Sequence, residues 1–226
     1  MGTNSKKVTM SLRKELPLIG IVLLPVCYLA YVWNDLPNKV PLHWNMNGEV
    51  DNYGDKSQLV FISILLPLLV YGIFLIIPKI DPKNKLNNMG NKLNAIKILL
   101  TTFISAIVIF IIYAASHASY NINFIVLLIG ILYIACGNYF KTIKANYFIG
   151  IRTPWTLESD EVWKSTHRLG GIMWFIGGFA VVISSLTLSV QANFKLLTII
   201  TVIIVLTPIV YSYYKFRSIQ KQASSS

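Results

Sequence analysis

Six stretches of about 20 mostly apolar residues dominate this chain of 226 residues. As an α-helix, such a stretch spans the ~30 Å hydrocarbon layer of a bilayer and pairs its own backbone polar groups there. Only 13% of the residues are charged, against about 25% in soluble domains. The sequence therefore predicts an all-α integral membrane protein. The six predicted transmembrane helices are Leu16–Trp33, Leu59–Pro78, Ile98–Ser116, Ile122–Phe140, Gly171–Val190 and Leu196–Tyr214.

The basic residues predict how these helices are oriented. All but three of the 20 Lys and Arg residues fall in segments that six alternating spans place on one side, and the exceptions are Lys39, Lys56 and Lys195. Because basic residues concentrate in cytoplasmic segments, both termini are predicted to be cytosolic. The net charge of +11 then reflects orientation and attraction to anionic lipid headgroups. We do not expect direct nucleic-acid binding, since the basic residues are spread over four short segments.

These spans divide the chain into four predicted parts. Residues 1–15 and 215–226 form cytosolic tails. Residues 16–97 form a two-helix region with an external loop at 34–58, and residues 98–214 form a four-helix region with a cytosolic loop at 141–168. Small residues in the fifth span, including Gly177 and Gly178, predict a closely packed helix face. That face could meet another helix of the bundle or a second copy in a homodimer.

The external loop predicts a short β-hairpin. Val40–Trp44 and Glu49–Tyr53 have strand character, and Asn47-Gly48 between them is a strong tight-turn signal. The hairpin is expected to lie on the outer membrane surface, held by local hydrogen bonds or serving as a surface for an extracellular ligand. Its acids and histidine match no standard metal spacing, so no metal is expected. The candidate residues of this loop are His43, Trp44, Asn45, Gly48, Asp51 and Tyr53.

The cytosolic loop is the least generic segment of the chain. Ser159, followed by two acids, predicts a helix start that runs straight into the fifth span. Thr153-Pro154 predicts an extended or turned backbone before it. Arg152 is expected to pair with Glu158, Asp160 or Glu161. The candidate residues of this segment are Asn138, Asn146, Tyr147, Gly150, Arg152, Thr153, Pro154, Trp155, Thr156, Glu161, Trp163, His167 and Arg168.

Two interpretations of this segment remain open. Its aromatic and basic residues could anchor the inner face of the bundle at the membrane interface, or they could form a docking site for a cytosolic partner. Catalysis is not expected, because the only acid–base arrangement is His167 beside Asp160 and Glu161. No cofactor is expected either. The six spans carry no ionisable residue well inside them, which counts against an ion-coupled transporter, although a channel or transporter for a small solute remains the alternative.

Several of these motifs resemble a known family. Similarity to the SdpI family of bacterial membrane proteins rests on Gly137-Asn138-Tyr139-Phe140, on Asn146 to Leu157, on Val162-Trp163-Lys164 and on His167-Arg168. The external loop resembles the uncharacterised N-terminal domain that is often joined to SdpI-like regions. That resemblance rests on Pro41, His43-Trp44-Asn45, Gly48, Asp51 and Tyr53-Gly54. Residues 98–214 are then the SdpI-like part.

The resemblance implies an immunity role in the bacterial cytoplasmic membrane. A protein of this kind would protect the cell from a secreted antimicrobial peptide toxin that reaches it from outside. It would also act in signalling, by holding a transcriptional repressor at the membrane when the toxin is present. A toxin would meet the external hairpin or the outer helix ends, and a repressor would meet the cytosolic loop.

Overall fold

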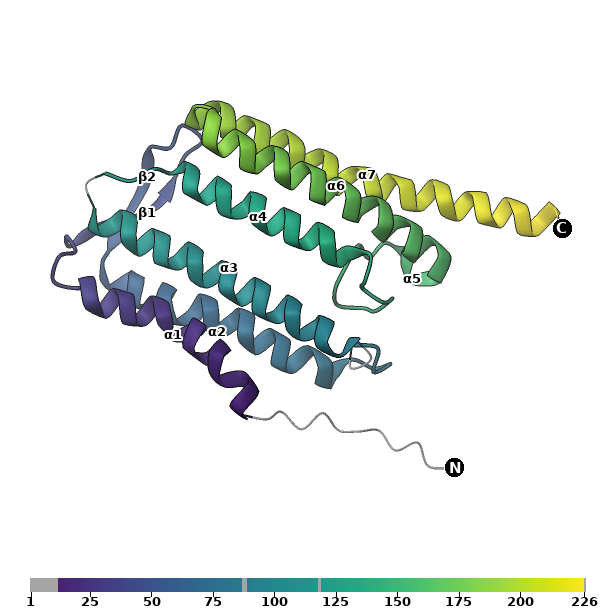
Figure 1. Ribbon diagram of the computed structural model, residues 1–226, viewed down its shortest axis with the longest axis horizontal. Coiled ribbons are helices and arrows are strands. Elements are labelled where there is room, and N and C mark those ends of the chain that lie inside the picture. The colour runs from purple at the N-terminus through teal and green to yellow at the C-terminus, as the bar shows by residue number, and fades with distance from the viewer. Residues whose placement is uncertain (1–11, 87–88, 118, 226) are drawn as a thin grey trace.

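The computed structural model describes residues 12–225, except 87–88 and 118. Over these residues the chain forms six long helices, one short helix and a two-stranded antiparallel sheet (Figure 1). Each long helix is long and apolar enough to cross a membrane, which confirms the predicted fold class. Most of the predicted N-terminal tail lies outside the described residues. The elements are α1 (Leu12–Val32), β1 (Lys39–Trp44), β2 (Val50–Asp55), α2 (Ser57–Ile80), α3 (Asn91–Ser116), α4 (Asn123–Phe140), α5 (Pro154–Glu158), α6 (Asp160–Thr187) and α7 (Val190–Ser225).

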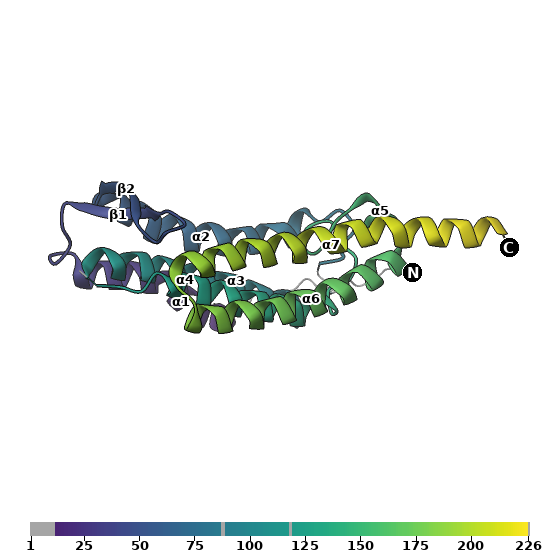
Figure 2. The same ribbon diagram turned by 90° about the horizontal axis from the view of Figure 1, so that it is seen from above.

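The six long helices lie side by side and give the molecule two distinct ends. The hairpin lies at one end, here called the hairpin end, and α5 lies at the opposite, loop end (Figure 1). Helix α3 packs mainly against α1 and α2, whereas α4 packs mainly against α6, which also packs against α7. Helix α7 continues past the other helices at the loop end (Figure 2). The bundle therefore consists of two groups of three helices that meet where α3 faces α4.

Several helices extend beyond the apolar stretches that predicted them. Helix α6 begins at Asp160, where the Ser159 hydroxyl accepts the backbone N–H of Val162 at 3.3 Å. This confirms the predicted cap and the continuous helix into the fifth span. At its other end α6 stops at Thr187, and Val190, which we expected to end the fifth span, instead begins α7. Polar residues at helix ends can be helical because water and caps satisfy the terminal backbone groups.

Glycines bring α4 and α6 into direct backbone contact. A methyl group on Gly178 would lie 2.6 Å from the backbone nitrogen of Ile134, and one on Gly171 would lie 2.9 Å from the carbonyl oxygen of Gly137. Atoms cannot approach that closely, so each position accepts only hydrogen. The predicted small residues of the fifth span therefore pack within the bundle: Gly171 and Gly178 face α4, and Gly177 faces Ile200 and Ile204 of α7.

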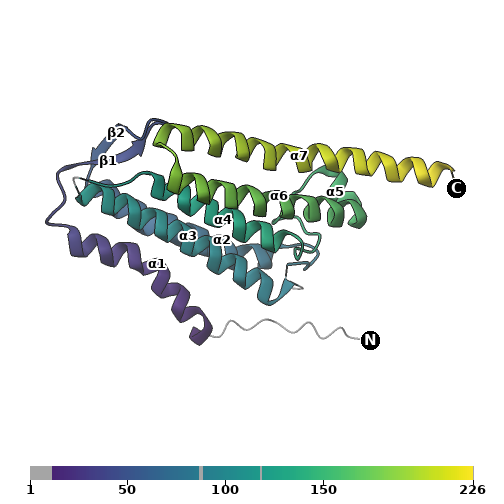
Figure 3. The ribbon, with the colours of Figure 1, turned by 45° about the horizontal axis from the view of Figure 1, so that its top comes forward.

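The predicted hairpin is present: β1 begins one residue earlier than expected, and β2 begins one residue later and ends two residues later than expected. The Asn45 side-chain oxygen accepts the backbone N–H groups of Asn47 and Glu49 at 2.8 and 3.1 Å, which closes the turn. Gly48 adopts a φ of +78°, which favours glycine. Trp44 donates its indole N–H to the Tyr120 hydroxyl at 2.8 Å. The hairpin therefore rests on the ends of the helices, and Figure 3 shows it beside the start of α7.

Candidate functional site

Asn146 organises the segment between α4 and α6, residues 141–159, which we call the connecting loop. Its side chain is 2% exposed. The amide nitrogen donates to the carbonyls of Lys144 and Ile149, and the amide oxygen accepts the N–H groups of Phe148 and Ile149, all at 2.7–3.0 Å. A buried amide that makes four hydrogen bonds fixes the backbone around it. Asn146 therefore acts as the internal frame of the loop.

Trp163 and His167 hold this loop against α6. The indole N–H of Trp163 donates to the carbonyl of Ile143 at 2.8 Å. The ring of His167 stacks on that of Trp163 with centroids 4.1 Å apart, and the two residues share one face of α6. Nε2 of His167 accepts the N–H of Ile151 at 3.0 Å, and Nδ1 lies 2.9 Å from the Trp163 carbonyl.

The hydrogen bonds of His167 determine its tautomer. A backbone N–H can only donate, so Nε2 is unprotonated, and Nδ1 carries the proton that it donates to the Trp163 carbonyl. The imidazole is thus neutral and has neither nitrogen free for acid–base chemistry. Gly150 lies against the ring with a φ of +114°, and a side chain there would collide with Nε2. These contacts make His167 a structural residue of α6 that holds the connecting loop in place.

Two threonines begin α5 and link it to α7. The Thr153 hydroxyl accepts the N–H of Thr156 at 3.2 Å, and the Thr156 hydroxyl accepts the N–H of Thr153 at 2.9 Å. This reciprocal capping arrangement satisfies backbone groups that the short helix leaves open. The Thr153 hydroxyl also lies 3.0 Å from the hydroxyl of Ser212 on α7. The ring of Trp155 adds an edge contact with Tyr213, at 5.1 Å between centroids.

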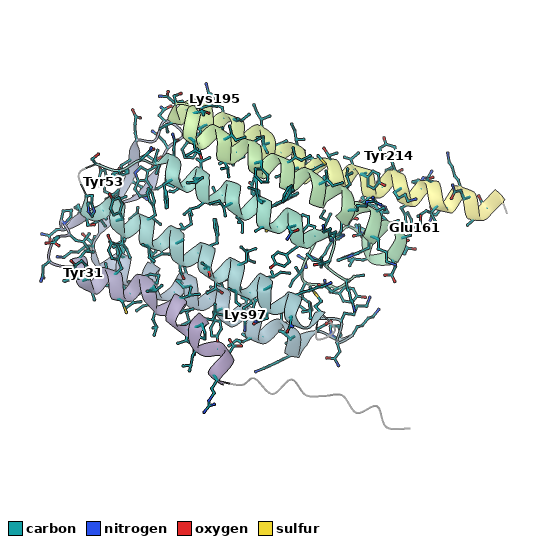
Figure 4. All side chains as sticks on the ribbon, viewed as in Figure 1. Tyr31, Tyr53, Lys97, Glu161, Lys195 and Tyr214 are labelled. Atoms are coloured by element: carbon teal, nitrogen blue, oxygen red, sulfur yellow. The ribbon has the colours of Figure 1, made fainter. Side chains whose placement is uncertain are left out.

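The charged residues of the loop do not pair as the sequence predicted. Arg152 was expected to pair with an acid, but its guanidinium donates to the carbonyl oxygen of Tyr147. Glu161 pairs instead with Lys215 of α7, at 2.8 Å, and Figure 4 shows Glu161 beside α7 at the loop end. A hydrogen bond with Lys83 lowers the pKa of the Tyr147 hydroxyl. Glu161 has a different partner than expected because α7 runs past the start of α6 and places Lys215 beside it.

Three predicted residues are exposed and lie outside this hydrogen-bond network. Asn138 lies near the end of α4, Pro154 begins α5, and Arg168 follows His167 on α6. Their exposure leaves them accessible, whereas Asn146, Thr156 and Trp163 are buried. The loop therefore combines an internal framework with an exposed surface.

The hairpin presents a second group of predicted residues. His43 and Asp51 form a pair with 2.6 Å between Nδ1 and Oδ1, and their side chains are 66% and 41% exposed. Tyr53 is 60% exposed and lies at the hairpin end (Figure 4). Gly48 faces the protein, since a methyl group there would lie 2.8 Å from Val190 at the start of α7. The hairpin thus has an exposed polar face and a face packed on the bundle.

The sequence did not reveal a buried ion pair between α1 and α3. Lys97 lies 2.7 Å from Glu15, and the two side chains are only 8% and 12% exposed. The Tyr71 hydroxyl of α2 donates to the same carboxylate at 3.0 Å. Both charges flank the predicted apolar stretches, so they were assigned to the polar segments. One feature of the sequence could have pointed to this pair: Glu15 is the single acid before the first span.

The fold is that of a multi-pass membrane protein, with a hairpin packed on the helices at one end and the hydrogen-bonded connecting loop at the other. Residues 142–212 match the SdpI/YfhL protein family, and residues 20–69 match a domain of unknown function, DUF1648. These two matches confirm the resemblance over the residues that they cover. It is 25% identical over 202 residues to "Immunity protein SdpI" of Bacillus subtilis (strain 168), covering 88% of this chain and 95% of that protein. No solved structure matches it.

Proposed function

We propose that this chain is a membrane immunity protein that protects a bacterium from a secreted antimicrobial peptide toxin by binding, without catalysis. The observation that carries the proposal is the similarity to an immunity protein over almost the whole of both chains. Two separate family regions match in the expected order, and they include both ends of the bundle. The neutral, fully hydrogen-bonded His167 supports binding over acid–base chemistry.

In this proposal the protein lies in the bacterial cytoplasmic membrane with both termini in the cytosol. Among the described residues, all basic residues except Lys39, Lys56 and Lys195 lie on the loop-end side, and basic segments stay in the cytoplasm. The hairpin then faces outward, where a secreted toxin arrives. Its exposed residues His43, Met46 and Tyr53 offer a surface that mixes polar and apolar contacts, which suits an amphipathic peptide.

We further propose that the connecting loop reports toxin binding by capturing a cytosolic transcriptional repressor. Helix α7 supports such coupling because it runs from one end of the bundle to the other. Near its start Val190 abuts Gly48 of the hairpin, and towards its other end Ser212 bonds Thr153 of the loop. A shift of α7 would therefore move both sites. Toxin binding would favour one of two positions of this helix, which is how two distant sites are coupled.

Expression in a sensitive bacterium tests the immunity role. Cells that carry the chain should survive a challenge with secreted peptide toxins from related strains, and cells without it should die. The double variant His43→Ala with Asp51→Ala should lose protection while it still inserts into the membrane. Lys195→Gln is the matched control, since Lys195 is exposed at the same end on α7. Survival unchanged across a broad toxin panel would favour the small-solute channel or transporter instead.

A localisation experiment tests repressor capture. In toxin-treated cells that produce this chain, a fluorescently tagged candidate repressor should move to the membrane, and Arg152→Ala should abolish that movement. Arg217→Ala on α7 removes an equal charge from the same end and should leave capture intact. Capture that persists in a well-folded Arg152→Ala protein would rule out Arg152 as the anchor, although protection itself could still stand.

A further inference from the structure

A basic pocket lies at the loop end, lined by the connecting loop and the start of α6. It has a volume of about 580 Å³ and brings together four lysines from three segments that are distant in the sequence. Lys85 comes from the connection between α2 and α3, Lys141 and Lys144 from the connecting loop, and Lys164 from α6. Asp160 is the single acid in its lining. The pocket is therefore strongly positive.

Asp160 is the one acid set against the four lysines in the lining of this pocket, so most of its positive charge is left without a counter-charge. Among the described residues, none of the four lysines takes part in a salt bridge. Glu161, next to Asp160, pairs with Lys215 at 2.8 Å and does not pair with a lysine of the pocket. Like charges gathered in one concavity repel one another and attract an anion. The N terminus of α6 adds partial positive charge at the same place.

An apolar cleft of about 510 Å³ is lined by a later stretch of the same loop. Phe74 and Leu100 line it from α2 and α3, and Phe148 and Ile149 line it from the connecting loop. Trp163, which lines the basic pocket, belongs to the same apolar cluster as Phe74 and Phe148. A positive pocket next to an apolar cleft, both at the ends of membrane helices, matches a molecule with an anionic head and an apolar tail.

We propose that the basic pocket binds the phosphate headgroup of an anionic phospholipid, with an acyl chain in the neighbouring cleft. Basic pockets between transmembrane helices on the cytoplasmic side bind such headgroups. The bound lipid would bridge the α2–α3 connection, the connecting loop and α6, and would stabilise the loop in one position. This role is separate from the proposed immunity function, because it concerns the membrane lipid and not the toxin.

Native mass spectrometry on the full chain in neutral detergent tests the proposal. Phosphatidylglycerol is titrated in, with phosphatidylcholine as the neutral lipid. The triple variant Lys85→Gln, Lys144→Gln, Lys164→Gln should bind phosphatidylglycerol at least about tenfold more weakly, since each lysine near an anionic headgroup contributes about fivefold. Asp160→Asn removes the one acid and should tighten binding, which a misfolded protein would not do.

The matched control removes three cations from the same end outside the pocket, as Lys79→Gln, Lys92→Gln, Arg217→Gln. It should keep nearly all of the phosphatidylglycerol affinity. Equal losses in the two triple variants would overturn the pocket, because general charge attraction would then explain binding. Displacement of the lipid by millimolar inorganic phosphate would overturn the lipid assignment in favour of a free anion. Equal binding of phosphatidylcholine would overturn the role of the headgroup charge.

Discussion

The backbone N–H of Ile151 donates to Nε2 of His167 over 3.0 Å, and this bond joins the connecting loop to α6. The imidazole is 1% exposed and also bonds the carbonyl of Trp163 through Nδ1. A neutral histidine that uses one nitrogen as acceptor and the other as donor can satisfy both a loop and a helix. The relationship explains why a buried histidine occupies this position.

Replacing His167 with alanine should destabilise the protein by about 3 kcal/mol. The change leaves the Ile151 N–H without its partner and opens a cavity beside Trp163, and both effects are unfavourable. Thermal unfolding in detergent measures the loss, and limited proteolysis should show faster cleavage within residues 141–159. Arg168→Ala, at the exposed neighbouring position, should change stability by less than about 0.5 kcal/mol. Equal effects of both changes would contradict the role given to His167.

The cap at Thr153 should be sensitive to loss of its hydroxyl. Thr153→Val removes the acceptor for the Thr156 N–H and the contact with Ser212, so we expect a loss of about 1–2 kcal/mol. Thr153→Ser keeps the oxygen and should be close to wild type. Ser212→Ala removes the link between Thr153 and α7, together with a bond to the Ile209 carbonyl within α7, but keeps the Thr153 cap, so it should loosen the loop less than Thr153→Val does. Hydrogen exchange at residues 151–159 distinguishes these variants.

Features set by local sequence could be predicted. Hydropathy over about 20 residues located the six spans, and Asn47-Gly48 located the hairpin turn because few residues accept its backbone angles. Ser159 located the start of α6, because a helix cap depends on its immediate neighbours. The small residues of the fifth span indicated a close-packed face, although they did not identify α4 as its partner.

Features set by contacts between distant segments could not be predicted. Glu161 was one of the acids expected to pair with Arg152, yet it pairs with Lys215, because α7 passes the start of α6. The same helix supplies Ser212 to Thr153. Trp44 finds Tyr120 only because the hairpin folds over the ends of the helices. Such pairings depend on how the helices pack in three dimensions, and this packing could not be predicted from one sequence.

The close contact between α4 and α6 should not tolerate a methyl group at Gly137. Gly137→Ala places a carbon against the backbone of Gly171 and Phe175, so the helices must separate, and overpacking of this kind typically costs about 1–3 kcal/mol. Gly72→Ala is the control, because a methyl group on Gly72 in α2 meets nothing within 4 Å. It should be neutral or slightly stabilising, since alanine favours helix by up to about 1 kcal/mol. Thermal unfolding of the two variants decides the point.

The buried pair of Glu15 and Lys97 should behave as a unit. Lys97→Met leaves a buried carboxylate with only the Tyr71 hydroxyl as partner, and removal of one member of such a pair costs about 3–5 kcal/mol. Glu15→Gln should cost a similar amount, because it leaves the ammonium of Lys97 uncompensated.

The double variant Glu15→Gln with Lys97→Met should recover much of that loss. It removes both charges together, and replacing a buried ion pair with uncharged groups is often neutral. Unfolding measured for the wild type, both single variants and the double variant forms a complete cycle, from which the coupling energy is obtained. A double variant that lost as much as the two singles added together would show that the charges act independently. Recovery in the double variant would instead show that the pair fixes α1 on α3 through mutual compensation of two buried charges.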